Sequence, residues 1–523
     1  MSGQNVSLLE LPPGVFQDST QYGAGKHWFS ANQIRWVNNV MLPVGGWRQL
    51  LNFSGITSKV VRKLFTWRDD LKAPWMAAGS EDKLIGVSYI EGSFTQYDIT
   101  PVGLAWNPGG VVGYGRRGYG TGLYGVDGSG SGVVLDSTAL WSMDNFGKLL
   151  VAVHSQDGRL VSWDPLTPAT PAAAVAGADP PPIDNSLVIA TEEEHLMLLG
   201  GKNNPRRVQW SSRREIGTWT AAEDNSAGGF DLKSNGAIIS ACKVQSGILV
   251  LTDTDVHLIE YVGPPNYYGR RKISDEGGII GLNTLSPVQG DAVWLDHANL
   301  FTYSGGAIEK VPCSLHTELF YNSNLSQAHT VHMGLNEFAQ ELWIFYPNQN
   351  SVEPDSYVAM SYSKDSYWTQ GQMPRSAWCS PVWQSKPIAV SGTILYEQEY
   401  GSLADGESRN NDIYAETGAL DISTEEDPEG GRNMWIDRIY QDAGVEGPGR
   451  TVGDPSAYSM TFKLAQAPGA PERTVGPINL GNPKGFTTVR MRARQAIVRI
   501  QQTKDVVWKL GKIRLRVKPG GKR

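Results

Sequence analysis

Residues 248–259, ILVLTDTDVHLI, contain the pattern that decides the fold. An apolar run is followed by a polar turn and then by a second run rich in apolar and β-branched residues. The same arrangement occurs seven times between about residue 60 and residue 400. The first runs are 74–78, 149–153, 196–199, 248–251, 292–295, 342–345 and 387–390, and the second runs are 84–87, 160–163, 208–210, 256–259, 300–303, 357–360 and 393–396.

Successive copies begin roughly 45 to 55 residues apart, with one longer gap of about 75. Strand pairs that recur at such a period are typical of a β-propeller, in which each repeat is one four-stranded blade. Unrelated strand pairs in one large sandwich are the alternative. The sequence therefore predicts an all-β protein with a β-propeller of six or seven blades over residues 51–404.

The composition agrees with many short strands joined by tight turns. The 523 residues include 59 glycines, 30 prolines and 17 tryptophans, and aromatic side chains suit the wedge-shaped cores between blades. The three cysteines imply no disulfide framework. No apolar run reaches the length of a membrane span, and the first residues lack the pattern of a secretory signal. We therefore expect no membrane span and synthesis in the cytoplasm.

Three further segments surround the predicted propeller. Residues 1–50 are predicted to form an extended arm, whose tryptophans require burial either in the closure of the propeller or on a neighbouring subunit. Residues 405–431 carry nine acidic residues against the single Arg409 and are predicted to be an acidic linker. Residues 432–523 are predicted to be a small β-sandwich domain.

The end of the chain is strongly basic. Residues 484–523 contain thirteen Lys and Arg and one acid, Asp505, a net charge of +12. The whole chain carries −7, so the remainder carries −19, the difference between the two. The cations alternate with apolar residues, and a period of two places them on one face of the strands. The predicted basic residues are Arg490, Arg492, Arg494, Lys512, Arg514 and Arg516.

A Gly/Tyr-rich insertion at 109–132 fills the long gap between the first two repeats. It contains a formal G-x-G-x-x-G at Gly113, Gly115 and Gly118, but no helix pattern follows, so dinucleotide binding is not indicated. The residues predict a flexible surface loop that is dispensable for folding. The sharper interpretation is a loop in a lumen or at a tip, where Tyr114, Arg116, Arg117, Tyr119 and Tyr124 contact one another or phosphates.

The sequence offers few signs of catalysis. Sialidase-type blade turns repeat S-x-D-x-G-x-x-W, and 155–158 and 363–368 only approach this pattern. His329 with His332, and Cys313 with His316, have a spacing that places them on opposite faces of a strand rather than on one metal. We therefore expect no enzyme, no cofactor and no metal. The sequence leaves open whether the fold brings together carboxylates from different blades, as glycosidases do.

Several stretches are similar to one family. LLELPPGVF from residue 8, ANQIRWVNN from residue 31, LPVGGW from residue 42, PRRVQWSS from residue 205, ILVLTDTDVHLIEYVGPP from residue 248 and VWKLGKIRLRVKPGGKR from residue 507 resemble the tail nozzle, tail tube or stabilisation protein of short-tailed bacteriophages. The resemblance covers most of the chain as a pattern of spaced residues. It implies a homo-oligomeric ring, a hexamer, in the virion tail below the portal and adaptor ring.

The resemblance also implies what such a ring does. It implies a structural protein that conducts viral DNA without sequence specificity and docks tail fibres or tip proteins. The alternatives are a glycan-binding or glycan-cleaving propeller in host-receptor recognition and a cellular interaction scaffold. For the basic residues we expect docking onto an acidic protein surface, either the 405–430 segment or the adaptor. DNA phosphates or solvent are the other options.

Overall fold

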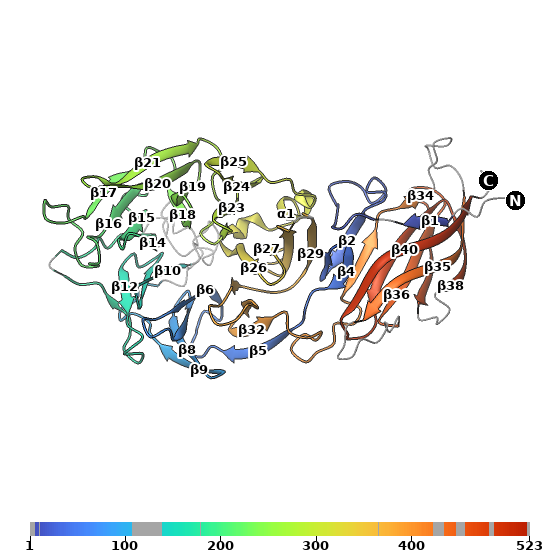
Figure 1. Ribbon diagram of the computed structural model, residues 1–523, viewed down its shortest axis with the longest axis horizontal. Helices are drawn as coiled ribbons and strands as arrows, with labels where there is room; N and C mark the ends of the chain where they lie inside the picture. Colours follow the sequence, from blue (N-terminus) through green and yellow to red (C-terminus); the bar gives the residue numbers. More distant parts are fainter. Residues whose placement is uncertain are drawn as a thin grey trace, which may run out of the picture.

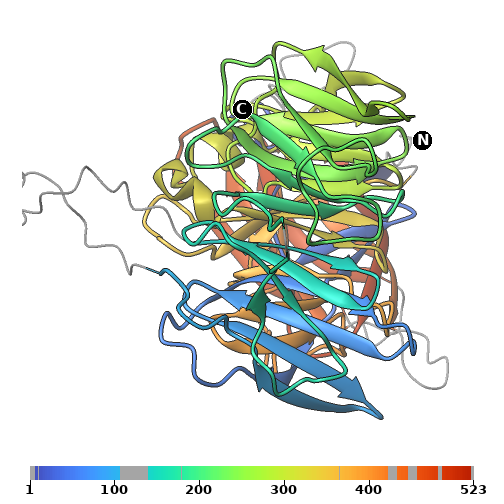
Figure 2. The same ribbon diagram turned by 90° about the vertical axis from the view of Figure 1, so that its left-hand side faces the viewer.

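A computed structural model describes residues 6–9, 11–106, 139–177, 179–363, 366–421, 433–445, 456–480 and 486–519. The chain forms a β-propeller and, beside it, a β-sandwich (Figure 1). The first described strand, β1 (Val6–Leu9), lies at the end of the sandwich that is far from the propeller. Figure 2 views the propeller from the side opposite the sandwich, with its sheets stacked around the ring.

The propeller has seven four-stranded antiparallel blades among the described residues. Blade 1 consists of β6 (Val61–Arg68), β7 (Pro74–Ser80), β8 (Leu84–Ile90) and β9 (Ser93–Asp98). Blade 2 consists of β10 (Trp141–Phe146), β11 (Leu149–His154), β12 (Leu160–Trp163) and β13 (Ala173–Ala174). Blade 3 consists of β14 (Leu187–Ala190), β15 (Leu196–Leu199), β16 (Arg207–Trp210) and β17 (Gly228–Asp231). Blades 4 and 5 are β18 (Ile238–Val244), β19 (Gly247–Thr252), β20 (Val256–Gly263) and β21 (Tyr267–Ser274); and β22 (Leu285–Val288), β23 (Asp291–Leu295), β24 (Leu300–Ser304) and β25 (Ala307–Lys310). Blades 6 and 7 are β26 (His332–Asn336), β27 (Glu341–Tyr346), β28 (Ser356–Ser361) and β29 (Trp368–Gln372); and β30 (Ala377–Cys379), β31 (Ile388–Ser391), β32 (Ile394–Gln398) and β5 (Trp47–Asn52).

The repeated pair of runs is the middle hairpin of each blade. Every first run forms the second strand of a blade, and every second run forms the third. These strands are largely apolar in their central residues because both faces of a blade pack against neighbouring blades. All four residues of β15, for example, are buried. The predicted propeller is therefore confirmed, and it has seven blades.

The ring is closed by a strand from the other end of the domain. The outermost strand of blade 7 is β5, which pairs antiparallel with β32 in a register that places Leu51 opposite Leu395. The innermost strands β6, β10, β14, β18, β22, β26 and β30 contact one another in sequence around the ring, and β30 contacts β6. A strand taken from residues 47–52 thus links the beginning and the end of the propeller.

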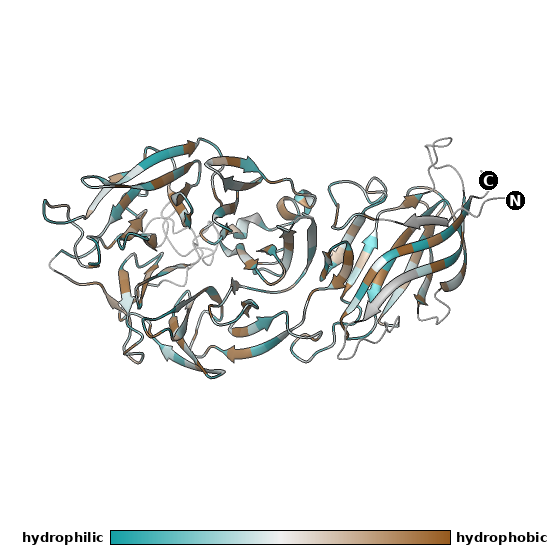
Figure 3. Ribbon diagram, viewed as in Figure 1, coloured by the Kyte–Doolittle hydropathy of each residue, from teal (hydrophilic) through white to brown (hydrophobic). Residues whose placement is uncertain are grey.

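Among the described residues, the sandwich consists of two six-stranded sheets. Sheet 1 has the order β3 (Ile34–Val37), β4 (Val40–Pro43), β40 (Trp508–Pro519), β35 (Met434–Val445) and β38 (Phe486–Ala493), with β1 (Val6–Leu9) also paired to β40. Sheet 2 has the order β2 (Trp28–Asn32), β33 (Tyr414–Thr417), β39 (Gln495–Gln502), β36 (Tyr458–Ala465) and β37 (Arg473–Asn479), with β34 (Leu420–Asp421) also paired to β39. Hydrophobic and hydrophilic residues alternate along β40, as Figure 3 shows.

The predicted N-terminal arm is part of both domains. Strands β1 to β4 belong to the sandwich, and β5 belongs to the propeller. Trp28 and Trp36 are each 4% exposed in the single chain. Of the two predicted places for the arm, closure of the propeller is therefore correct for β5. The tryptophans need no neighbouring subunit, because the sandwich of the same chain buries them.

The predicted acidic linker at 405–431 is wrong for its described part. Residues 414–417 and 420–421 form β33 and β34 of sheet 2, and Ile413 and Ala415 are fully buried. The short alternation of apolar and polar residues from Ile413 to Glu416 is a strand pattern that the acidic composition obscured. The C-terminal part of the sandwich therefore begins at β33, before the predicted boundary at residue 432.

The two domains are joined by a buried polar cluster and a continuous core. β2 and β3 pack against β29 of blade 6. The Arg35 guanidinium on β3 donates to the carboxylates of Glu341 on β27 and Glu399 just after β32. A hydrophobic cluster also extends from Ile344 in blade 6 through Trp36 to Met460 in sheet 2. The propeller and the sandwich are thus held in one fixed arrangement.

The helices are short. In the described part of the chain they are α1 (His316–Phe320) and the 3-10 helix η1 (Leu325–Thr330), both in the connection between blades 5 and 6. Over the described ranges, no helix is long and apolar enough to cross a membrane. The insertion at 109–132, including Tyr114, Arg116, Arg117, Tyr119 and Tyr124, lies outside the described residues, so the predictions for it stay predictions.

Candidate docking face on the sandwich

The basic residues of the C-terminus lie mainly on the outer face of sheet 1. Along β38 and β40 the apolar residues Val489, Met491, Ile513, Leu515 and Val517 are buried in the sandwich core. The residues between them point outward: Arg490, Arg492, Lys512 and Arg514 are exposed, and Arg516 is half-buried. The predicted alternation is therefore present in the structure.

The strand between them, β35, completes this surface. It pairs with β38 on one side and with β40 on the other. Trp435 lies opposite Arg492 and also opposite Lys518, and residues directly opposite each other in antiparallel strands share a face. We call this surface the basic face; it consists of Trp435, Asp437, Arg438, Tyr440, Phe486, Arg490, Arg492, Lys512, Arg514, Arg516 and Lys518.

Arg494 does not belong to the basic face. It lies at the bend between β38 and β39, half-buried, and its backbone N–H donates to the Ala465 carbonyl of sheet 2. The chain crosses from one sheet to the other at this position. The prediction that Arg490, Arg492 and Arg494 share one face is therefore wrong for Arg494.

A β-bulge places one carboxylate among these cations. Ile436 pairs with Val517 of β40 and Arg438 pairs with the next residue, Arg516, so Asp437 is an additional residue relative to β40. Relative to β38 the register shifts the other way, and the additional residue lies on β38. Its carboxylate binds the Arg516 guanidinium through two hydrogen bonds and lies 3.4 Å from the Lys518 Nζ. The hydrogen bonds from Arg516 hold the pKa of Asp437 below its usual range. Arg516 is thereby fixed in position on the face.

The basic face also carries aromatic side chains. Trp435 is 43% exposed. The Arg438 guanidinium lies 4.6 Å from the centre of the Phe486 ring, a cation–π contact. The Phe486 ring centre is 5.9 Å from that of Tyr440. Exposed aromatic residues among arginines are enriched at protein–protein interfaces.

Sequence reasoning missed Trp435 and Asp437. Trp435 could have been found, because buried Met434 and Ile436 flank it and strand alternation points it outward. Asp437 had no comparable signal, since the bulge depends on how β35 pairs with β40, which is not visible in local sequence.

The acidic segment meets basic residues on the other sheet. The Glu416 carboxylate of β33 lies 2.9 Å from the Lys463 Nζ and 3.5 Å from the Arg499 Nη1, both in sheet 2. Gln21 donates to the same carboxylate. Within residues 405–421, Glu416 therefore pairs with cations of sheet 2 and not with cations of the basic face. The predicted pairing with the six basic residues is therefore not made by Glu416.

The residues with metal-like spacing do not share a strand, contrary to the expectation: His329 lies in η1 and His332 in β26, and Cys313 precedes α1, which begins at His316. His332 is buried and its ring stacks on Phe345, with centroids 5.0 Å apart. Burial lowers the pKa of His332 to about 4. Burial also raises the pKa of the Cys313 thiol to about 12. In the part of the chain that the structure describes, no three His, Cys, Asp or Glu side chains gather as a metal site.

Comparisons with known proteins concern the fold only. No family model matches the sequence, and no curated protein matches it. YCF48 from Cyanidioschyzon merolae is 9% identical with a TM-score of 0.39, covering 68% of this chain and 98% of that one. The Pan2 WD40 domain of Neurospora crassa is 9% identical with a TM-score of 0.38, covering 69% of this chain and 96% of that domain. Neither similarity bears on function.

Proposed function

We propose that this chain is a structural subunit of a ring in a bacteriophage tail, of the nozzle or tube type. In this role it conducts DNA during ejection and docks other tail components. The sequence resemblance along most of the chain suggests the role. The single structural observation that carries it is the basic face, a charged and aromatic surface on one side of a domain that is rigidly joined to the propeller.

The junction between the domains suits a building block that must keep its shape. The buried cluster around Arg35 and the shared hydrophobic core hold propeller and sandwich together. A tail component transmits force and position between its neighbours, so a fixed angle between two domains is an advantage. A propeller on a flexible linker would not position a docking surface.

The basic face is proposed to dock an acidic surface of an adjacent tail protein. Cations on neighbouring strands repel one another unless an anionic partner lies opposite. Within this face, Asp437 engages Arg516 and Lys518. Trp435 offers a flat apolar anchor among the arginines, of the kind that contributes most to protein interfaces. DNA contact is the other outcome that the experiments must separate.

Charge separation along the chain suits a conduit. Outside the basic C-terminus the residues sum to −19, and an acidic body does not retain a polyanion by attraction. A ring of such bodies lets DNA slide. The tryptophans of the N-terminal arm give no support for a ring, because the same chain buries Trp28 and Trp36. The proposed hexamer therefore rests on the resemblance.

Electron microscopy of the chain in its assembly tests the proposal. The chain would be co-expressed with the portal and adaptor proteins of the tail to which it is proposed to belong, and the purified particles imaged. We expect a cyclic ring, six-fold by the resemblance, attached to the adaptor. A single asymmetric copy in such particles contradicts the proposal. Release of sugar from bacterial surface polysaccharide by the purified chain, abolished by one Asp or Glu substitution, also contradicts it.

A further inference from the structure

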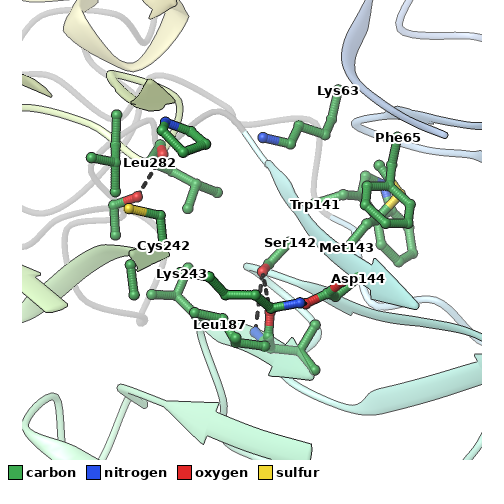
Figure 4. Close-up of a pocket in the computed structure, with 16 residues that line it drawn as sticks. Lys63, Phe65, Trp141, Ser142, Met143, Asp144, Leu187, Cys242, Lys243 and Leu282 are labelled. Carbon is green, nitrogen blue, oxygen red and sulfur yellow. Dashed lines mark hydrogen bonds and ion pairs between the residues drawn. The ribbon is translucent and has the colours of Figure 1, made fainter. Parts of the chain in front are cut away.

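The propeller channel contains a cavity that the proposed tail function does not use. Its volume is about 300 Å³, at the lower end of the range for small-molecule sites. The innermost strands of blades 1 to 5 contribute to its wall (Figure 4). Most lining residues are apolar; they include Phe65, Met143, Leu187, Leu282 and Leu285. A few polar side chains reach the same space.

Among the described lining residues, two of the three charged groups neutralise each other. The Lys243 Nζ on β18 lies 2.9 Å from the Asp144 Oδ2 on β10. Asp144 is further held by the Ala190 backbone N–H, which donates to the same oxygen over 2.9 Å. This pair leaves the charge of the cavity to Lys63.

Lys63 differs from Lys243 in having an amide as its partner. Its side chain extends from β6 toward the space between the strands (Figure 4). The Nζ donates to the Asn283 Oδ1 over 3.0 Å, and no carboxylate in the described ranges forms an ion pair with it. Burial lowers the pKa of the Lys63 ammonium. A desolvated ammonium with one neutral partner has two further N–H donors to satisfy.

The remaining polar groups in the cavity are neutral. The Ser240 Oγ donates to the Leu282 carbonyl over 2.9 Å, and the Ser142 Oγ accepts from the Val188 N–H over 3.1 Å. Burial raises the pKa of the Cys242 thiol to about 12, so this group stays protonated and uncharged. The described lining therefore carries one net positive charge, at Lys63.

We propose that the propeller channel is a binding site for a small organic monoanion, a carboxylate on a flat apolar body. The carboxylate binds the Lys63 ammonium beside Asn283, and the apolar body packs against Phe65, Met143 and Leu285. A single cation matches one carboxylate. A phosphate dianion requires more donors than this cavity offers. The cavity volume equals that of roughly ten water molecules, enough for a two-ring compound.

The probe for this proposal is 2-naphthoate, with 2-naphthamide as its neutral counterpart. Both would be titrated by calorimetry into the purified full-length chain. We expect the carboxylate to bind about tenfold more tightly than the amide or better, because a buried hydrogen bond to a charged group is worth that factor. Equal affinities for the two compounds, or no binding of the carboxylate at millimolar concentration, overturn the proposal.

Two variants change the cavity charge in opposite directions. Lys63→Met keeps the length of the side chain and removes its charge, so it should weaken naphthoate binding about tenfold or more. Asp144→Asn frees Lys243 as a second cation, while the amide oxygen can still accept from Ala190, so it should tighten binding. Lys83→Met is the control, because Lys83 pairs with Asp98 and does not line the cavity.

The pattern across the variants decides the proposal. Wild-type affinity in Lys63→Met, or weaker binding in Asp144→Asn, contradicts a carboxylate held by Lys63. Thermal unfolding of each variant checks that it is folded. If Lys63→Met does not fold, the comparison of carboxylate with amide and the Asp144→Asn variant still test the proposal. None of these measurements requires the ring, so their failure is distinct from failure of the tail function.

Discussion

The Arg35 guanidinium on β3 donates a 2.8 Å hydrogen bond to the Glu341 carboxylate on β27, so a buried ion pair joins the sandwich to the propeller. The same guanidinium binds both oxygens of Glu399, over 2.6 and 2.9 Å. Tyr367 and Trp343 donate to Glu341, and Asn336 donates to Glu399. Burial raises the pKa of Glu341. At Glu399 burial acts in the same direction, but attraction and hydrogen bonding to Arg35, together with hydrogen bonds from Asn336 and the Gly45 N–H, outweigh it and lower the pKa.

The first prediction concerns this cluster. Arg35→Met should destabilise the chain by about 3–5 kcal/mol, because it leaves two buried carboxylates without their cation. Denaturant unfolding measures the loss. Arg35→Met/Glu341→Gln/Glu399→Gln should recover more than half of it, since no charge is then left buried. The partly exposed pair Lys83–Asp98 is the control, where Lys83→Met should cost under about 1 kcal/mol. A cost as small as this at Arg35 would contradict the assignment of the cluster as the link.

The second prediction is a loss of stability in acid caused by His332. Burial lowers the pKa of this histidine to about 4 in the folded chain, from 6.5 in the reference state. Between these values the unfolded chain binds a proton that the folded chain does not. Stability is therefore full above about pH 6.5 and falls as the pH decreases toward 4, by about 3 kcal/mol in total.

The comparison of two variants isolates this contribution. Unfolding midpoints would be measured from pH 7 to pH 4 for the wild type, His332→Gln and His297→Gln. His332→Gln should reduce the dependence of the unfolding midpoint on pH in this window. His297→Gln replaces an exposed histidine and is the control, with the wild-type dependence on pH expected. An identical slope in wild type and His332→Gln would show that other groups cause the acid sensitivity.

The third prediction is that β5 is required for a folded propeller. A chain beginning at residue 53 lacks the outer strand of blade 7 and strands β1 to β4 of the sandwich. It should lose cooperative thermal unfolding. A protease site inserted within 54–60, between β5 and β6, is the matched control. Cleavage there leaves β5 paired with β32, so the nicked chain should unfold cooperatively. Cooperative unfolding of the truncated chain near the wild-type midpoint would contradict the closure by β5.

The fourth prediction concerns the basic face. Arg490→Glu/Arg492→Glu/Arg514→Glu changes three exposed residues, so the chain should stay folded with a midpoint close to the wild type. Docking predicts that this variant fails to join tails, and that low salt worsens the defect because like charges are then least screened. Tail incorporation is measured in co-expressed particles. DNA contact predicts normal assembly with altered ejection.

The control for the fourth prediction makes the same charge change elsewhere. Lys233, Arg271 and Lys310 are exposed on the propeller, and their replacement by Glu should leave tail assembly unchanged. If the variant of the basic face assembles and infects like the wild type, the face is solvated surface and the docking proposal is wrong. If both triple variants fail equally, net charge rather than this face is responsible.

The propeller could be predicted from sequence because its signal is local and repeated. Each middle hairpin is apolar over two short runs, as at 248–251 and 256–259, and the period of the copies matches one blade. The alternation of Arg490, Met491 and Arg492 likewise follows from strand geometry alone, so the exposed positions on β38 were predictable.

Only the tertiary structure decided which distant segments pair with each other. Leu51 lies opposite Leu395, and Glu416 of the supposed linker binds Lys463, because the closed ring and the sandwich bring these residues together. The bulge that inserts Asp437 depends on how β35 pairs with β40, a strand about 70 residues further along the chain. Nothing in the local sequence distinguishes Lys63 from Lys243, and only the arrangement of the blades places Asp144 beside Lys243. Local residue patterns determine strands and their faces, whereas the partner of a charge depends on which strands the fold places together.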